Sequence, residues 1–201
     1  MINANSIIKK TLFAEANYKD RCVKDYKELK DFIEHCRGIG LKIVLTQGSW
    51  DLVHVGHGRY LEAARKLGDL LIVGVDSDEK IKARKGPDRP IVPQDERMEM
   101  LTHLKSVDLV VLKELGAPKW SLIKTVKPDI LIVIPENYTK KEIKELKKYC
   151  GEVVVLPRMA TTSTSAKIRL MQIKMAERFE QSLTPRLIGM IQEVLGTSNK
   201  K

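Results

Sequence analysis

The sequence predicts an α/β protein with a doubly wound, parallel, five-stranded sheet. Five short runs dominated by Val, Ile and Leu lie between residues 42 and 157, and helical patterns separate them. The runs lack an alternation of polar and apolar residues, which is typical of strands in a parallel sheet that helices cover on both faces. Alternating strands and helices form βαβ units with right-handed crossovers.

The predicted elements follow one another at short intervals. The expected strands are KIVLTQG (42–48), LLIVGVD (70–76), DLVVLK (108–113), DILIVI (129–134) and EVVVLP (152–157). The expected helices between them span residues 58–67, 95–105, 117–126 and 139–149.

A further helix is expected on each side of the sheet. Before it, apolar residues recur at helical spacing from Tyr26 to Cys36, and the glycines of RGIG (37–40) can end that helix. After it, Thr184 is the expected N-cap of a last helix, with Pro185 in the first helical position and Gly196 as the stop. The apolar stripe of this helix consists of Leu187, Ile188, Ile191, Val194 and Leu195.

The composition is that of a soluble globular protein expected in the cytoplasm. Apolar residues make up 43% of the chain, yet no apolar run approaches the roughly 20 residues of a membrane-spanning helix. The N-terminal residues show no export signal, and three cysteines without a CxxC pair fit a reducing compartment. No membrane association is expected.

The net charge of +10 favours partners that carry phosphate. Lysines are spread over the whole chain and do not gather in a block with interleaved aromatic residues. This distribution favours small phosphorylated ligands, and no nucleic-acid partner is expected.

Four polar segments follow predicted strands. They are GSWDLVHVGH (48–57), Asp76 with Ser77, PENY (135–138) and ATTSTSAKIR (160–169). Open parallel sheets bind ligands at the carboxyl ends of their strands, near the point where the winding reverses. The four segments are therefore expected to converge on one crevice.

Two of the four histidines, His54 and His57, stand in the first of these segments. If Gly56 and His57 open a helix, both imidazoles lie at its N-terminus, where free N–H groups and the helix dipole favour an anion. We interpret the pair as a phosphate cradle, with Gly48 allowing close approach of the backbone. Zinc with Asp51 as third ligand, and two purely structural histidines, are the alternatives.

Cations and hydroxyl groups in two other segments fit phosphate oxygens. The segment from residue 82 to 97 is expected to be a mobile loop with the cations Lys82, Arg84, Lys85, Arg89 and Arg97, which could clamp a polyphosphate or be solvated surface. Hydroxyl residues from Thr161 to Ser165 precede a helical pattern that begins near Ala166, and Lys167 or Arg169 could neutralise phosphate there. An ordinary helix cap is the alternative.

Together, GSWDLVHVGH and STSAKIR resemble the two signatures of the HxGH nucleotidyltransferases, the cytidylyltransferase-like superfamily. Residues 68–112 and 122–133 resemble the adenylyltransferase domain that makes ADP-heptose from a heptose 1-phosphate, and glycerol-3-phosphate cytidylyltransferases come next. The resemblance covers residues 41–171. It implies a nucleotidyltransferase domain over that range, with helical extensions at 1–40 and 172–201.

The resemblance implies a Rossmann-like fold and transfer of a nucleoside monophosphate from a nucleoside triphosphate to a phosphorylated acceptor, with release of pyrophosphate. It favours ATP and a sugar phosphate, with CTP and a polyol phosphate as the alternative. A protein that only binds nucleotide or RNA on the same fold is a further alternative. The resemblance also implies Mg²⁺ with the triphosphate and a homodimer.

The resemblance carries site roles over by position. His54, His57 and Lys85 would act on the transferring phosphate. The residues implied in nucleotide binding are Gln47, Gly48, Ser49, Trp50, Asp51, Gly56, Asp76, Arg97, Ser163, Thr164, Ser165 and Arg169.

Two departures from the family pattern bear on the substrate. Relatives read Asn-Gly-Cys-Phe-Asp where this chain reads QGSWD (47–51), and Trp50 can fill the same apolar slot. Heptose-type enzymes have Lys-Gly-Gly-Asp-Tyr after the fourth strand, where this chain has VIPENY (133–138). Pro135 and Glu136 remove the close backbone approach that glycine allows, so a different acceptor is an open alternative.

Overall fold

The computed structural model describes residues 17–135, 138–157, 159 and 164–198. The chain divides into two compact units, Met1–Thr161 and Thr162–Lys201. In the part of the chain that the structure describes, no helix is both long enough and apolar enough to cross a membrane. The expected division at residues 40 and 171 stays a prediction.

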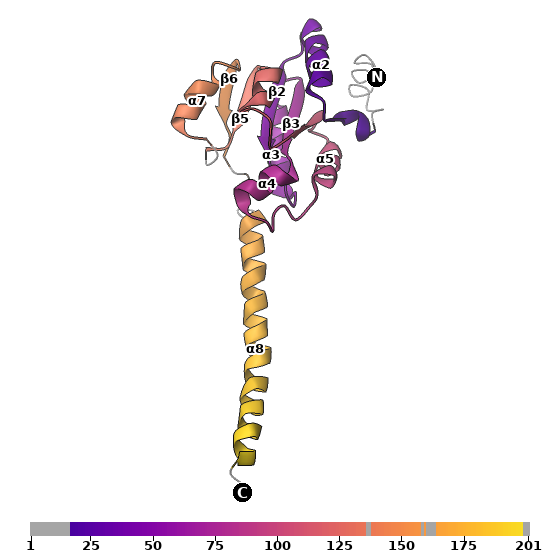
Figure 1. The fold of residues 1–201 in the computed structure, drawn as a ribbon. Coiled ribbons are helices and arrows are strands. Elements are labelled where there is room, and N and C mark those ends of the chain that lie inside the picture. Colours follow the sequence, from indigo (N-terminus) through magenta and orange to yellow (C-terminus); the bar gives the residue numbers. More distant parts are fainter. Residues whose placement is uncertain (1–16, 136–137, 158, 160–163, 199–201) are drawn as a thin grey trace. The chain divides into compact units, whose positions relative to one another are not determined.

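The first unit is built on a parallel sheet of six strands (Figure 1). Its strands are β1 (Cys22–Val23), β2 (Ile43–Gly48), β3 (Leu70–Asp76), β4 (Leu109–Lys113), β5 (Ile130–Val133) and β6 (Glu152–Val155), in the spatial order β1-β4-β3-β2-β5-β6. The predicted fold class is confirmed, whereas the count of five strands is wrong. The extra strand, β1, has two residues beside β4 and is too short to leave a sequence pattern.

The helices of this unit lie between the strands. They are α2 (Tyr26–Gly38), α3 (Val55–Arg65), α4 (Asp78–Lys85), α5 (Gln94–Thr102), α6 (Ser121–Val126) and α7 (Lys140–Leu146), after a short 3₁₀ helix at Lys19–Arg21. Helix α4 corrects the expectation of a loop from residue 82. Only Ile81 of its eight residues is buried, so α4 has no apolar stripe to reveal it.

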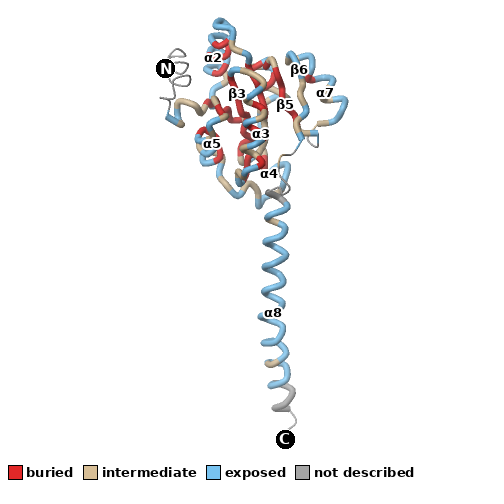
Figure 2. The backbone as a smooth tube through the Cα atoms, turned by 180° about the vertical axis from the view of Figure 1, so that it is seen from behind, coloured by how far each residue is buried: buried red, intermediate tan, exposed pale blue. Residues whose placement is uncertain are grey.

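Two hydrophobic layers cover the sheet, one on each face. Buried residues of α2, α6 and α7 pack on one face, and those of α3 and α5 pack on the other. Figure 2 shows the buried strands between helices whose outer sides are exposed. The strands need apolar side chains on both faces, which is why their sequences do not alternate.

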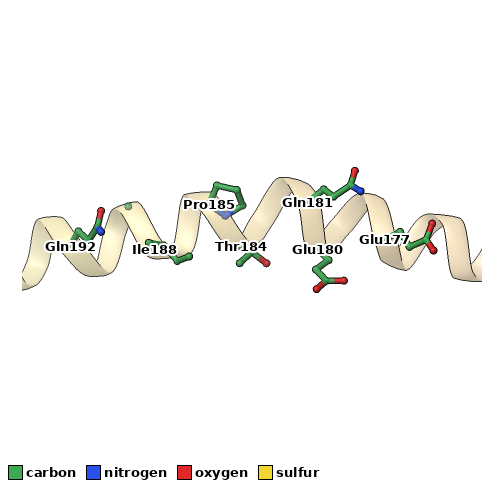
Figure 3. Close-up of a pocket in the computed structure, with 8 residues that line it drawn as sticks. Glu177, Glu180, Gln181, Thr184, Pro185, Ile188 and Gln192 are labelled. Atoms are coloured by element: carbon green, nitrogen blue, oxygen red, sulfur yellow. The ribbon is translucent and has the colours of Figure 1, made fainter.

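The second unit contains helix α8 (Thr164–Ser198). It begins close to the expected start at Ala166, but it runs through Pro185, so a new helix capped by Thr184 and a stop at Gly196 are wrong. One proline removes one helical hydrogen bond, and the residues on both sides keep the helix continuous. A shallow pocket beside Pro185 is lined by residues of α8 alone (Figure 3) and contains no expected site residue.

Candidate active site at the carboxyl ends of the strands

The winding of the sheet reverses between β2 and β5, which are neighbours in space and distant in sequence. Gln47, near the end of β2, and Tyr138, which follows β5, meet across this point. The Gln47 Nε2 donates a hydrogen bond of 2.6 Å to the Tyr138 hydroxyl. The structure therefore brings the end of β2, just before the first predicted segment, together with the third segment, where an open α/β sheet binds its ligand.

His54 and His57 form a close pair at the start of α3. His54 is the N-cap, and its Nδ1 accepts from the Gly56 N–H at 3.1 Å. The His57 Nδ1 accepts from the His54 N–H at 3.2 Å, and the two ring centroids lie 4.1 Å apart. Gly56 lies at the start of the helix, as expected, and its backbone N–H donates to His54.

These bonds set the protonation of the pair. Because each Nδ1 accepts a backbone hydrogen bond, a neutral ring carries its proton on Nε2. Burial, followed by the charges of His54 and Lys85, lowers the pKa of His57 from 6.5 to about 4. His57 is therefore a neutral donor at pH 7, which suits it to a developing phosphoryl charge.

Trp50 shapes the turn between β2 and α3. It adopts φ 55°, is 5% exposed, and donates from Nε1 to the Gly74 carbonyl at 3.0 Å. Its ring lies edge-on to His57 at 5.5 Å. The indole also lies against Gly48, where a Cβ would sit 3.3 Å from its Cε2. The indole thus lies between Gly48 and His57, and the expected roles of Gly48 and Trp50 in nucleotide binding stay predictions.

Asp51 anchors the segment between α4 and α5. It is 3% exposed and accepts from the Arg89 Nε at 2.9 Å and from the backbone N–H groups of Ile91 and Val92. These bonds within the protein argue against Asp51 as a zinc ligand, and its expected role in nucleotide binding stays a prediction. Within the described ranges, no group of three or more His, Cys, Asp or Glu residues is arranged to hold a metal.

Arg97 is the largest fully buried side chain, at 1% exposed. Its Nε donates to the Val92 carbonyl at 2.9 Å, and its Nη2 donates to the Asp76 carbonyl at 2.8 Å and to Asp78 at 2.7 Å. Its Nη1 donates to the Ser49 carbonyl. Arg97 therefore joins the strand ends to the segment between α4 and α5, and its expected role in nucleotide binding stays a prediction.

A charged cluster surrounds Asp76 at the end of β3. Its Oδ1 accepts from the Lys113 Nζ at 2.9 Å, and its Oδ2 accepts from the Arg84 Nη2 at 3.0 Å. The Arg84 Nη2 also donates to the Ser49 Oγ at 2.9 Å. Lys113 is not among the site residues predicted from the sequence. The signal that could have found it is a lysine that ends an otherwise apolar strand.

Lys85 connects this cluster to the histidines. It is the exposed last residue of α4, and desolvation, followed by the charges of Arg84 and Arg89, lowers its pKa. The charges of Asp51 and Asp76 act in the opposite direction. The charge of Lys85 also contributes to the lowered pKa of His57.

The remaining predicted site residues belong to the second unit. Ser163 falls outside the described residues, and for Thr164 and Ser165 the structure describes only their helical backbone in α8. Arg169 is exposed on α8.

In the segment that departs from the heptose-type pattern, Pro135 is exposed, while Glu136 and Asn137 fall outside the described residues. The roles of these residues stay predictions.

Comparison with known proteins gives one family model and a set of relatives. The model, described as cytidylyltransferase-like, matches residues 45–175. The bifunctional protein HldE of Nitratiruptor sp. is 46% identical over 121 residues, which are 60% of this chain and 26% of that protein. HldE of Syntrophotalea carbinolica is 37% identical over 166 residues, 81% of this chain and 32% of that protein. The chain thus spans about a quarter to a third of these relatives.

Solved structures with similar folds include two named proteins. A lipopolysaccharide core biosynthesis protein from Thermoplasma volcanium is 31% identical with a TM-score of 0.49, and the match covers 62% of this chain and 100% of that chain. Pantoate-beta-alanine ligase from Francisella tularensis is 15% identical with a TM-score of 0.53, covering 72% of this chain and 68% of that chain. The second likeness supports the fold alone.

Proposed function

Because the chain belongs to the cytidylyltransferase-like family and is a nucleotidyltransferase, we propose that it transfers the adenylyl group of ATP to a sugar phosphate and releases pyrophosphate. The histidine pair at the start of α3 is the observation that carries this proposal. Each ring accepts a backbone hydrogen bond at Nδ1, which leaves the proton of a neutral ring on Nε2, and the charge of Lys85 acts on His57. The HldE relatives and the resemblance to ADP-heptose synthesis favour glycero-manno-heptose 1-phosphate as the acceptor.

In the proposed reaction, an oxygen of the acceptor phosphate attacks the α-phosphorus of ATP in line, and pyrophosphate leaves. The new P–O bond forms as the bond to the leaving oxygen breaks, so no covalent enzyme intermediate is needed. The Nε2–H groups of His54 and His57 would donate to the α-phosphoryl oxygens, and Lys85 would balance charge on the leaving group. Catalysis would then come from positioning and from preorganised donors.

Mg²⁺ fits this proposal as a partner of the triphosphate. Magnesium usually keeps several waters and binds substrate phosphates with only one or two carboxylates. The carboxylates of Asp51 and Asp76 are bonded to cations and backbone groups of the protein. We infer that the triphosphate supplies most of the ligands, and that Mg²⁺ neutralises phosphate charge when it is bound.

Cytidylyl transfer from CTP to a polyol phosphate is the second candidate, because the matching family model carries the cytidylyltransferase description. We further propose that the protein works in the cytoplasm as a homodimer. The three cysteines, which are free thiols in the structure, support a reducing compartment.

The test is pyrophosphate release with Mg²⁺. ATP, CTP, GTP and UTP are each offered with glycero-manno-heptose 1-phosphate, other sugar phosphates and glycerol 3-phosphate. We expect release with ATP and a sugar phosphate. Release with CTP and glycerol 3-phosphate alone would transfer the proposal to the second candidate. A folded protein that releases nothing with any pair would refute both.

A further inference from the structure

Lys113 holds an ammonium group whose hydrogen-bonding capacity is mostly unused. Its side chain is 13% exposed, and its Nζ donates to Asp76 at 2.9 Å. Along the described stretches of the chain, Asp76 is its one hydrogen-bond partner. An ammonium has three donors, and buried polar groups are normally satisfied. Two N–H groups of Lys113 therefore call for acceptors that a ligand or water supplies.

Gln47, on the same face of the sheet, has a hydrogen-bond acceptor that is not used. Its Nε2 bonds to Tyr138, but its Oε1 is buried and lacks a hydrogen-bond partner among the described residues. Gly74 lies between Gln47 and Lys113: a Cβ at Gly74 would be 2.9 Å from the Lys113 Cδ and 3.0 Å from the Gln47 Cβ. The stems of the Gln47 and Lys113 side chains thus approach one glycine from the two neighbouring strands, and the Leu122 Cδ2, 2.6 Å from the same Cβ position, lies beside them.

The charge around these residues suits an anion. Arg84 and Lys113 supply two cations against the single carboxylate of Asp76. Arg84 uses only its Nη2 in its bonds to Asp76 and Ser49, which leaves Nε and Nη1 without a partner in the described part of the chain. The Arg84 Nη2 donates to the Ser49 Oγ, and the ring of the next residue, Trp50, lies 5.5 Å from that of His57, so the cluster borders the histidine site.

We propose that Lys113 and Gln47 bind the phosphorylated acceptor, with Lys113 and Arg84 holding its phosphate and the Gln47 Oε1 accepting from one of its hydroxyl groups. This assignment rests on the proposed function and narrows the acceptor to a polyhydroxylated phosphate. Choline phosphate offers no N–H or neutral O–H donor to Gln47, so the site discriminates against it. A site built to bond a hydroxyl rejects analogues that lack one.

The first test is Lys113→Met, with Lys80→Met as the matched control. Lys80 is a nearby lysine on α4 whose Nζ donates to the Glu114 carbonyl at 3.4 Å. For Lys113→Met we expect the KM of the acceptor to rise roughly 10- to 100-fold, as loss of charge-assisted hydrogen bonds does, with the KM of ATP within about 2-fold. Lys80→Met should change neither by more than about 2-fold. An unchanged acceptor KM, or an equal rise in both, overturns the assignment.

The second test compares Gln47→Leu with Tyr138→Phe. Both variants remove the Gln47–Tyr138 hydrogen bond, but only Gln47→Leu removes the buried Oε1. Gln47→Leu also relieves an unsatisfied group, so it should fold even if Lys113→Met does not. We expect Gln47→Leu to lose most of the preference for sugar phosphate over choline phosphate, whereas Tyr138→Phe keeps it. Equal preference in the two variants contradicts the role of Gln47.

Calorimetric titration separates this inference from the proposed reaction. Glucose 1-phosphate, glycerol 3-phosphate and choline phosphate are titrated with and without a non-hydrolysable ATP analogue. Binding of the first two that Lys113→Met abolishes, in a protein that turns over no pair, would retain the acceptor site and refute the reaction. Turnover by the wild-type protein, together with unaltered acceptor binding in Lys113→Met, would retain the reaction and refute the acceptor site. Binding of none of the three probes overturns the site.

Discussion

At the scale of single residues, the candidate site depends on how a few buried groups use their hydrogen bonds. The two Nδ1 atoms of His54 and His57 cap α3, and this use fixes the Nε2 protons. Asp51 and Arg97 form their hydrogen bonds with other groups of the protein. Lys113 has N–H groups, and Gln47 has a buried Oε1, without a hydrogen-bond partner among the described residues. Residue types alone do not distinguish these cases, because a buried charge can be a scaffold or a ligand contact.

Replacing His57 tests the catalytic role of the pair. His57→Ala removes one preorganised donor, and we expect turnover to fall by about 100-fold or more while the fold stays intact. His103→Ala is the matched control, since His103 is an exposed histidine beside Glu99 on α5. Pyrophosphate release and thermal unfolding of both variants give the answer. Full activity or an unfolded protein for His57→Ala would show that His57 has another role.

The lowered pKa of His57 predicts a loss of stability in acid. An unfolded histidine binds its proton near pH 6.5, whereas folded His57 resists protonation until about pH 4. The unfolded state thus binds more protons between these values, and the free energy of unfolding falls as pH decreases from 6.5 to 4. Other groups titrate in the same window, so the comparison is with His57→Asn, which cannot titrate.

Urea unfolding at pH 7.5, 5.5 and 4.5 measures this difference. Wild type should lose more stability than His57→Asn, and the histidine signal assigned by NMR should titrate near pH 4. A histidine titrating at 6.5 with identical acid losses in both proteins would contradict the buried, neutral ring.

At the scale of elements, Arg97 couples α5 to the ends of β2 and β3. Removing it leaves the Asp78 carboxylate and the carbonyls of Ser49, Asp76 and Val92 without their donor. We expect Arg97→Met to lower the free energy of unfolding by roughly 3–5 kcal/mol, as loss of one partner of a buried charge pair does. The exposed Arg59→Met on α3 should stay within about 0.5 kcal/mol. Denaturant unfolding distinguishes the two, and equal midpoints would rule out this coupling.

Pro185 predicts a weak point in α8. It has no N–H for the carbonyl of Gln181, and proline in a helix interior costs about 3 kcal/mol relative to alanine. We expect Pro185→Ala to slow amide hydrogen exchange in the turns around residue 185. Gly189→Ala, where a Cβ meets nothing within 4 Å, should give a smaller effect of about 1 kcal/mol. Exchange that is unchanged by Pro185→Ala would mean that the helix is not continuous there.

At the scale of the whole molecule, hydrophobic periodicity predicted the sheet, the parallel direction of its strands and the four helices that connect them. It missed β1, whose pairing with β4 is a tertiary contact between two short segments. It missed α4 for lack of an apolar stripe, although Ser77 as N-cap, acids in the first turn and basic residues in the last turn mark that helix. The site segments were predicted from strand ends, whereas the buried states of Arg97 and Lys113 follow from packing that no local pattern records.

The charge of the whole molecule predicts weak binding to nucleic acid. The 36 basic residues exceed the 26 acidic ones, but two of the cations near the strand ends are not available to a nucleic acid: Arg97 is buried, and Arg89 pairs with Asp51. A nucleic-acid groove needs many exposed cations along one path, and each phosphate contact adds about −0.9 to the salt slope on duplex and −0.7 on a single strand.

We therefore expect single-stranded RNA to be retained only weakly on filters at 50 mM salt, and the logarithm of the affinity to change by no more than about two per tenfold change in salt concentration. Pyrophosphate release should persist at 200 mM salt, because the donors at α3 are preorganised and partly shielded. A slope of about −6 with tight binding at 50 mM, together with no turnover, would instead identify an RNA-binding protein on this fold.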